Sequence, residues 1–556
     1  TMTHYDLKAV KIPRLAGGAL RAFTEALENP LGASLLLGKL LEDGGITKIR
    51  RTVIDDAPTY LPIYPSESKG TPSTDLLNIP HPPKTKSGFS FSTVHDFHNA
   101  YRDRKTTPDQ VVEKVLGAID ASKSLNTFIA VNRDDVMAQA RVSAQRWRDG
   151  KPLSIFDGVP VAIKDEVDQT PYPTTVGTKF FGKSPATKDS TTVARLRAAG
   201  ALLIGKANMH EIGINPVGFN AHYGTTRNPY NTNHYTGGSS SGSATAAASG
   251  LCPVALGADG GGSIRIPSAL CGLVGLKSTF GRVSEYGAAP LAWSVAHLGP
   301  LAASAADAAL MYAVIAGADS QDPNTHYQPA PSLADFGNMD LRGLKLGVYR
   351  EWFNHATPEI VAACEAMLKN FVGMGAEVRE IEIPDLDLTR IAHVIAILGE
   401  MATAMQPYYE KHRRDFGLDV RVNLAIGRAF TSRDYVHAQR MRTRAIANFA
   451  KVLVDVDVIV SPATAVTAPP IPADAIAAGE SDLSTVTELM RYVFSGNLTG
   501  LPAISFPVGY DSKGLPIGMQ VMGRAWNEHT LLRLANAAET ATEKKKPQAY
   551  FPILDL

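Results

Sequence analysis

From residue 107 onward, short apolar segments of strand length alternate with longer segments of helical length. Thr107 followed by Pro108 is typical of a helix start. The expected strands lie at 127–131, 158–163, 201–204, 344–349, 458–460 and 503–508, and further helices lie at 134–148 and 191–199. Because buried strands separated by helices pack as a sheet between helical layers, we expect an α/β domain with a central mixed β-sheet covered by helices on both sides.

The first 57 residues are expected to form a helical extension to this domain. Leu15, Leu20, Phe23 and Leu27 recur at helical spacing, Pro30 interrupts the pattern, and a second helix follows. The second helix is apolar on more than one face. It therefore packs on the main domain, forms a dimer contact or dips into a membrane.

A linker is expected between the extension and the main domain. Residues 58–88 contain seven prolines and little periodicity, which predicts an extended segment along the surface. The catalytic domain is then expected to span residues 89–556.

The charge and the cysteine content argue against several classes of function. A formal net charge of +1 argues against a nucleic-acid partner. Cys252, Cys271 and Cys364 do not have the spacing of a zinc site or a disulfide framework, so they are expected to be free thiols in a reducing compartment. The first residues lack the layout of a secretion signal, and no run of about eighteen apolar residues predicts a membrane span. The protein is therefore expected on the cytoplasmic side and not secreted.

Three consecutive glycines precede Ser263 in the segment Asp-Gly-Gly-Gly-Ser-Ile-Arg at 259–265. Because glycine has no Cβ, several backbone N–H groups can turn inward here and stabilise a developing negative oxygen. One well-placed donor of this kind contributes roughly 2.7–4 kcal/mol in the transition state. A serine at the end of such a nest is placed to attack the carbonyl whose oxygen the nest receives. Taken alone, such a segment is more often a tight turn without a ligand.

Two further features complete a candidate catalytic site. Ser239 lies in the run 237–243, and the small residues after it predict a closely packed helix whose N-terminus points at the serines. Lys164 ends the apolar run 159–163, where a buried amine beside hydroxyls would act as a base. Alone, these features are also typical of a flexible loop and of an exposed edge lysine. Together with Ser263 they supply the nucleophile, the proton acceptor and the oxyanion site of amide hydrolysis.

These segments resemble the amidase signature family. Ser239 and Ser263 are 24 residues apart, which is the family's interval, and Lys164 lies upstream where the family has its lysine. The matching segments are YTGGSSSGSA (235–244), ADGGGSIRIPSALCG (258–272), GKANMHE (205–211), YGTTRNP (223–229), DVDVIVSP (455–462) and GLPAISFPVGYDSKGLPIGMQVMG (500–523). The resemblance implies the amidase signature fold and a serine hydrolase that cleaves C–N bonds.

The family mechanism, carried over to these positions, makes Lys164 the neutral base. Ser239, held by a cis peptide bond to Ser240, relays the proton, and Ser263 attacks to form an acyl-enzyme. Asp259 and Arg265 brace the implied oxyanion hole, which consists of the backbone N–H groups of Gly260, Gly261, Gly262 and Ser263. Gly260 departs from the family pattern, because most members carry Thr, Ile or a similar residue there.

Within the family, the whole chain resembles the plant-type fatty acid amide hydrolases, including the segments 29–51 and YFPIL at 550–554. That resemblance implies N-acylethanolamines and related lipid amides as substrates and no cofactor. It also implies a homodimer, peripheral contact with membranes and N-terminal helices that line the lipid access route. Met209 is expected in the core, with contact to the acyl chain as the alternative.

Several other functions stay open from the sequence. A hydrolase of short or aromatic amides or carbamates, and the glutaminase subunit of a tRNA-dependent amidotransferase, would have the same triad. Segment 238–242 satisfies the G-x-S-x-G pattern of α/β-hydrolases with Ser240 as nucleophile, but residues 228–234 do not predict the strand that must precede it. Segment 200–207 resembles a phosphate-binding loop, but Ala207 replaces the hydroxyl that binds magnesium. His210 and Glu211 adjoin without forming HExxH, so no metal site is expected.

Overall fold

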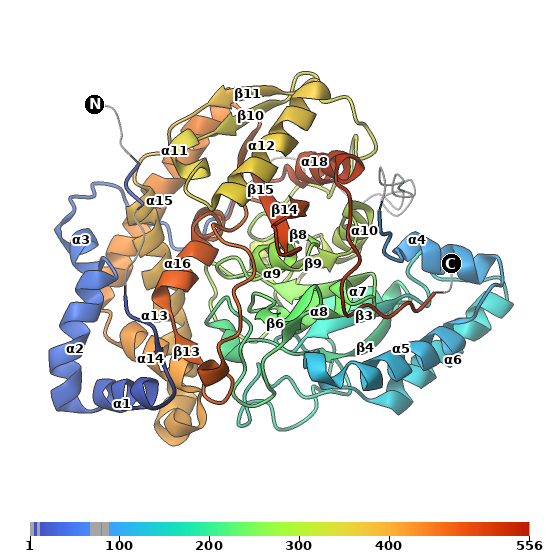
Figure 1. Ribbon diagram of the computed structural model, residues 1–556, viewed down its shortest axis with the longest axis horizontal. Coiled ribbons are helices and arrows are strands. Elements are labelled where there is room, and N and C mark those ends of the chain that lie inside the picture. Colours follow the sequence, from blue (N-terminus) through green and yellow to red (C-terminus); the bar gives the residue numbers. More distant parts are fainter. Residues whose placement is uncertain (1–4, 8–11, 67–78, 80–87, 555–556) are drawn as a thin grey trace.

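A mixed sheet of eleven strands forms the centre of the computed structural model, which describes residues 5–7, 12–66, 79 and 88–554 (Figure 1). The strand order is β11-β10-β12-β15-β14-β8-β9-β7-β3-β4-β2. Their bounds are β2 (Phe128–Ala130), β3 (Pro160–Lys164), β4 (Leu202–Ala207), β7 (Val254–Ala258), β8 (Val274–Lys277), β9 (Leu298–Ala302), β10 (Lys345–Val348), β11 (Glu377–Glu380), β12 (Val458–Pro462), β14 (Ala503–Tyr510) and β15 (Pro516–Gly523). Parallel pairs, such as β3 with β4 and β7, stand beside antiparallel pairs, such as β14 with β15, so the predicted mixed sheet is confirmed.

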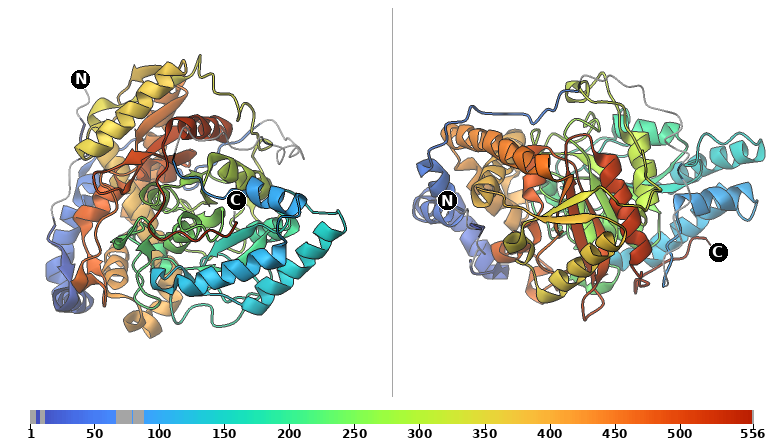
Figure 2. Two further views of the ribbon diagram at one scale, coloured as in Figure 1. Left: turned by 45° about the vertical axis from the view of Figure 1, so that its right-hand side comes forward. Right: turned by 90° about the horizontal axis from the view of Figure 1, so that it is seen from above.

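Helices cover both faces of this sheet, as predicted (Figure 2). One group packs together against the central strands and consists of α7 (Thr191–Ala198), α10 (Ala305–Ile315), α12 (Pro358–Gly373) and α18 (Glu528–Ala541). A second group begins with the short helices α8 (Ser241–Ala248) and α9 (Arg265–Leu270), in which every residue is buried. Because every residue of α8 and α9 is buried, these two helices are enclosed within the molecule.

The remaining helices form the flanks. At the β2 edge lie α4 (Val94–Arg102), α5 (Pro108–Ala121) and α6 (Arg133–Arg148), and the predicted start of α5 is confirmed by a capping box at Thr107. On the opposite flank lie α13 (Leu386–His412), α14 (Leu418–Arg428), α15 (Ser432–Asp455), α16 (Leu483–Met490) and α17 (Phe494–Thr499), while α11 (Arg350–Phe353) is a single turn after β10.

The N-terminal extension is helical, as predicted. It contains α1 (Gly17–Glu28), α2 (Pro30–Asp43) and α3 (Ile46–Arg51), and the break at Pro30 arises because Asn29 caps the second helix and the proline opens it. These helices lie beside α13, α14 and α15 at the outer edge of the molecule (Figures 1 and 2). Glu28 pairs with Arg421 of α14 at 2.6 Å, and both side chains are almost fully buried. Apart from residues 58–66, 79 and 88, the expected linker at 58–88 falls outside the described residues.

One long helix meets the length and hydropathy criteria of a membrane span, which the sequence prediction overlooked. The candidate window lies in residues Leu386–Asp415, chiefly in α13, and 61% of it is buried inside the fold. The same helix packs against α14, α15 and α17. Its apolar character is therefore explained by its place in the core.

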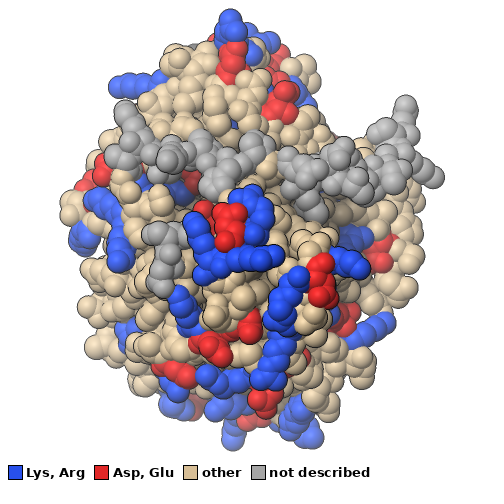
Figure 3. Space-filling view, turned by 90° about the vertical axis from the view of Figure 1, so that its right-hand side faces the viewer, with Lys and Arg blue, Asp and Glu red and all other residues tan. Residues whose placement is uncertain are grey.

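Basic and acidic side chains are interspersed on the face of the molecule shown in Figure 3. This mixture agrees with the formal net charge of +1. No single sign of charge dominates that face, and a surface of this kind gives little electrostatic attraction to a polyanion.

Candidate active site

Three chain segments meet at one edge of the central sheet. Strands β3 and β7 are parallel neighbours, with Ile163 opposite Leu256, so their carboxyl ends lie side by side. Lys164 is the last residue of β3, and Asp259 follows the last residue of β7. The third segment is the turn into α8, where the Ser240 N–H donates to the Ser263 carbonyl at 3.3 Å. The three predicted side chains are thus brought to one place by strand pairing and by this backbone contact.

Lys164 is buried with 1% of its surface exposed. Its Nζ donates to Ser239 Oγ at 2.9 Å and to the Ala258 carbonyl at 3.2 Å. It also pairs with Glu166 at 2.8 Å, and the Glu166 side chain is only 8% exposed. Sequence analysis did not name Glu166, which lies in the turn directly after β3, where the Val167 N–H donates to the Lys164 carbonyl at 3.1 Å. The arrangement provides a buried amine that can exchange a proton with the Ser239 hydroxyl.

The cis peptide bond predicted at Ser239–Ser240 lies one residue earlier, at Gly238–Ser239. The prediction of its position was therefore wrong. Gly238 is closely packed, since a Cβ at this position would lie 2.9 Å from the Gly218 nitrogen. The next peptide is trans and is held on both sides, because the Ser239 carbonyl accepts from the His210 N–H at 3.1 Å and the Ser240 N–H donates to the Ser263 carbonyl.

Ser263 lies at the floor of a pocket and is 8% exposed. Within the described residues its hydroxyl makes no hydrogen bond, so the hydrogen-bonded chain runs from Lys164 to Ser239 and stops short of Ser263. By contrast, the Ser240 hydroxyl is fully buried, donates to the Ala258 carbonyl at 3.1 Å and accepts from the Ala258 N–H at 3.3 Å. Ser263 is therefore the accessible serine of this group, and Ser240 is tied to β7.

The glycine segment before Ser263 leaves three backbone donors unused. The N–H groups of Gly260, Gly261 and Ser263 have no acceptor among the described residues. The fourth predicted donor differs, because the Gly262 N–H donates to Asp259 Oδ1 at 2.6 Å. The nest can therefore offer Gly260, Gly261 and Ser263 to an oxyanion, while Gly262 serves to fold the turn.

The Asp259 carboxylate holds this turn in place through hydrogen bonds and an ion pair. It accepts from the N–H groups of Gly262 and Ile264, from Asn497 at 2.9 Å and from the Arg265 guanidinium at 3.1 Å. Burial alone would raise the pKa of this carboxyl, but the Arg265 charge and the hydrogen bonds hold the pKa of Asp259 well below its usual range. Asp259 thus stays ionised and braces the turn, as the sequence predicted for it and for Arg265.

Replacing Arg265 with methionine is expected to lower the free energy of unfolding by about 3–5 kcal/mol. The physical reason is that the Asp259 carboxylate would stay buried without its counter-ion, since both side chains are 0% exposed. Urea titration at neutral pH would measure the loss. Arg342→Met is the matched control, because Arg342 also pairs with an aspartate but is 82% exposed, and its loss should matter little. Equal losses in both variants would contradict the role given to Arg265.

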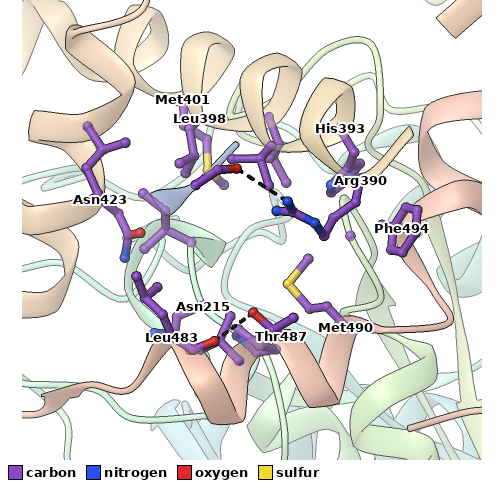
Figure 4. A pocket seen from close by; sticks show the side chains of 18 of the residues that line it. Asn215, Arg390, His393, Leu398, Met401, Asn423, Leu483, Thr487, Met490 and Phe494 are labelled. Carbon is purple, nitrogen blue, oxygen red and sulfur yellow. Dashed lines mark hydrogen bonds between the residues drawn. The ribbon is translucent and has the colours of Figure 1, made fainter. Parts of the chain in front are cut away.

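The pocket above Ser263 has a cavity volume of about 170 Å³ and is mainly apolar. Side chains of α13, α14 and α16 surround it (Figure 4). The N-terminal extension contributes Leu40 and Ile46 to its wall. Met209 does not line it, because its fully buried side chain packs in the hydrophobic cluster that contains Val176 and Ile212. Met209 therefore lies in the core, as its first interpretation predicted, and it is not among the described residues that line this pocket.

Two polar residues beside the nucleophile segment were missed by sequence analysis. Asn497 of α17 donates to the Asp259 carbonyl at 2.8 Å, and His393 of α13 contacts the Gly260 carbonyl at 2.8 Å. Both lie more than a hundred residues away in the chain, and nothing in their local sequence marks them. Among the described residues, no group of three or more His, Cys, Asp or Glu side chains is placed to hold a metal ion.

Comparisons with known proteins agree with this arrangement. A family model described as Amidase matches residues 110–532. The fatty acid amide hydrolase of Arabidopsis thaliana is 41% identical over 588 aligned residues, which cover 99% of this chain and 96% of that protein. A glutamyl-tRNA(Gln) amidotransferase subunit of Thermosynechococcus vestitus is 34% identical, and the match covers 82% of this chain and 100% of that protein. The solved peptide amidase from Stenotrophomonas maltophilia aligns with a TM-score of 0.69 at 28% identity, over 83% of this chain and 98% of that chain.

Proposed function

Since the chain belongs to the amidase signature family and is an amidohydrolase, we propose that it cleaves fatty acid amides through an acyl-enzyme on Ser263. The observation that carries this proposal is the mainly apolar pocket whose lining includes Ser263 and Gly261. An aliphatic chain gains roughly 0.8 kcal/mol for each CH₂ group that it buries. A long acyl chain thus supplies the binding energy that such a pocket can use.

In the proposed mechanism, neutral Lys164 takes a proton from Ser239, which in turn accepts the proton of Ser263 as the Ser263 oxygen attacks the amide carbonyl. This step requires the Ser263 hydroxyl to turn toward Ser239 when substrate binds. The N–H groups of Gly260, Gly261 and Ser263 receive the oxyanion. The proton then passes to the leaving amine, and water releases the fatty acid by the same route in reverse.

Two features support a lipid amide over glutamine as the substrate. Charged side chains are few in the pocket, and the extension places Leu7, Ile12, Leu40 and Ile46 in its lining. The Arabidopsis fatty acid amide hydrolase also aligns over 99% of the chain, compared with 82% for the amidotransferase subunit. N-acylethanolamines are therefore the proposed substrates, and the glutaminase role is the less favoured alternative.

The extension also supports a proposed contact with lipid or with a second copy of the chain. Leu31 and Leu35 on α2 are 79% and 80% exposed. Large apolar side chains that stand together on an exposed helix are typical of interaction surfaces. We therefore keep a homodimer and peripheral membrane association on the cytoplasmic side as part of the proposal.

A panel of N-acylethanolamines from C2 to C20 tests the substrate class. We expect kcat/KM to rise with acyl length, so that the C16 amide exceeds the C2 amide by about 100-fold or more, because burial of only three to four CH₂ groups at about fourfold each already gives roughly 100-fold. Free fatty acid released from detergent-dispersed substrate would be measured. Equal rates for C2 and C16 would favour a hydrolase of short amides.

A matched pair of variants on α2 refines this test. Leu40 lines the pocket, whereas Leu35 lies on the same helix and is exposed. Leu40→Lys should lower kcat/KM for the C16 amide much more than for the C2 amide, and Leu35→Lys should leave both unchanged in detergent. A parallel loss on both amides in Leu40→Lys would contradict a pocket wall formed by the extension.

A further inference from the structure

The Gly260 carbonyl is held by a histidine that belongs to no predicted catalytic group. His393 lies on α13 where this helix crosses the nucleophile turn, is 0% exposed, and has its Nε2 2.8 Å from the Gly260 oxygen. A carbonyl oxygen only accepts, so Nε2 carries the proton in this contact. The other ring nitrogen, Nδ1, has no partner among the described residues. Within the described residues, the imidazole thus makes one hydrogen bond, which it donates to the turn before Ser263.

This bond fixes where the Gly261 N–H points. In a trans peptide, the carbonyl of one residue and the N–H of the next lie in one plane and point in opposite directions. Holding the Gly260 carbonyl against His393 therefore turns the Gly261 N–H away from α13. That N–H has no acceptor within the described part of the chain.

The neighbouring peptides of the turn are held in the same way. The Asp259 carbonyl accepts from Asn497 Nδ2 at 2.8 Å, which orients the Gly260 N–H. The Gly262 carbonyl accepts from the Ile266 N–H at 2.7 Å, which orients the Ser263 N–H. Each of the three unused donors thus follows a carbonyl that has its own partner. His393 is the side chain that performs this task for the middle peptide.

A glycine pair needs such an anchor more than other residues would. Glycine has access to a wide range of φ and ψ, so a peptide between two glycines can rotate at little steric cost. His393 restricts this rotation by contact as well, since a Cβ on Gly261 would lie 2.8 Å from its Cε1. Burial lowers the pKa of His393 to about 4, so the ring is neutral and keeps its donor at neutral and alkaline pH.

We propose that His393 is a positioning residue of the oxyanion hole, whose Nε2–H orients the Gly260–Gly261 peptide so that the Gly261 N–H meets the developing oxyanion. The inference rests on the proposed function of Ser263 as the nucleophile. His393 also lines the pocket, and Figure 4 shows it among the side chains that surround it. The experiment must therefore distinguish an effect of His393 on the oxyanion hole from an effect on substrate binding.

The test compares variants that keep or remove the donor. His393→Gln retains an N–H that reaches about as far as Nε2, whereas His393→Phe and His393→Met fill a similar volume without a donor. We expect Phe and Met to lower kcat by about 10- to 100-fold with little change in KM, which is less than the 10²- to 10³-fold cost of deleting such a donor. Gln should recover most of the wild-type kcat. Two donor-free variants are used so that a folding failure of one does not decide the result.

A trifluoromethyl ketone with a long acyl chain separates a positioning role from a purely structural one. If His393 only supported the fold, the inhibition constant of this compound would not change in step with kcat/KM. The adduct of this compound with the serine carries an oxyanion, so its inhibition constant should weaken in His393→Phe by the same factor as kcat/KM. Affinity for a long-chain primary alcohol, which fills the acyl pocket but carries no anionic oxygen, should stay within about twofold. A rise in KM with unchanged kcat, or a glutamine variant as impaired as the phenylalanine variant, would overturn the inference.

Labelling of the wild-type protein tests the assignment of Ser263 as the nucleophile independently of the role proposed for His393. A fluorophosphonate should modify Ser263 whether or not His393 positions the hole, and failure of that labelling would contradict the proposed nucleophile itself. If Ser263 is labelled and wild-type turnover is normal, full activity of both donor-free variants would count against His393 alone.

Discussion

Replacing Ser263 with alanine is expected to lower kcat for amide hydrolysis by about 10⁵- to 10⁶-fold. Among the described residues that line the pocket, the only other hydroxyl belongs to Thr487, and it is engaged because it donates to the Leu483 carbonyl at 2.7 Å. Turnover of a C16 acylethanolamide, followed by free-acid detection, measures the effect. Mass spectrometry of the fluorophosphonate-treated wild type should place the adduct on the peptide that contains Ser263.

Ser240→Ala is the matched control for this experiment. Ser240 is the nucleophile that an α/β-hydrolase would use, but its hydroxyl is bonded to both backbone groups of Ala258 and is fully buried. Its removal should cost about tenfold or less in kcat. An active Ser263→Ala protein, or an inactive Ser240→Ala protein that still folds, would reverse the assignment of the nucleophile.

Much of the fold follows from local sequence, because the central strands are buried on both faces and are therefore continuously apolar. Where a polar residue interrupts the apolar pattern, the predicted strand ended too early. The strand expected at 201–204 continues through Lys206 to Ala207. Lys206 is buried because Asp165 lies 3.7 Å away and the Thr174 hydroxyl accepts from it at 3.3 Å. These partners come from another segment, so a single strand gives no sign of them.

In the candidate site, too, some residues were predictable from local sequence and others were not. Lys164, Ser239 and Ser263 each stand in a segment whose composition marks it, and their residue types fit one reaction. His393 and Asn497 act by contacting a backbone carbonyl, so their role depends on where α13 and α17 cross the turn. Within α13, His393 is one polar residue on a mostly apolar helix face, and the same pattern would suit an ordinary core histidine. Positioning roles of this kind become visible only when the packing of the helices is known.

Replacing Lys164 with methionine is expected to lower kcat by about 10³- to 10⁴-fold, because the Ser239 hydroxyl then has no base within reach. Methionine is close to the length of the lysine stem and leaves the buried site without the amine. Among the described residues, Lys164 is the only hydrogen-bond partner of the Ser239 hydroxyl, so no other side chain is in place to take its proton. Circular dichroism and thermal melting would establish that the variant is folded, and an active folded variant would contradict the assignment of the base.

Glu166→Gln is the companion variant, because it keeps the lysine and removes the carboxylate that pairs with it at 2.8 Å. A carboxylate at this distance stabilises the ammonium form, whereas catalysis requires the neutral amine. The other nearby acid, Asp165, is engaged with Lys206 and stays unchanged. At a fixed neutral pH, kcat/KM of Glu166→Gln is therefore expected to exceed that of the wild type. An unchanged or lower kcat/KM in a folded Glu166→Gln protein would show that Glu166 does not oppose proton uptake by the base.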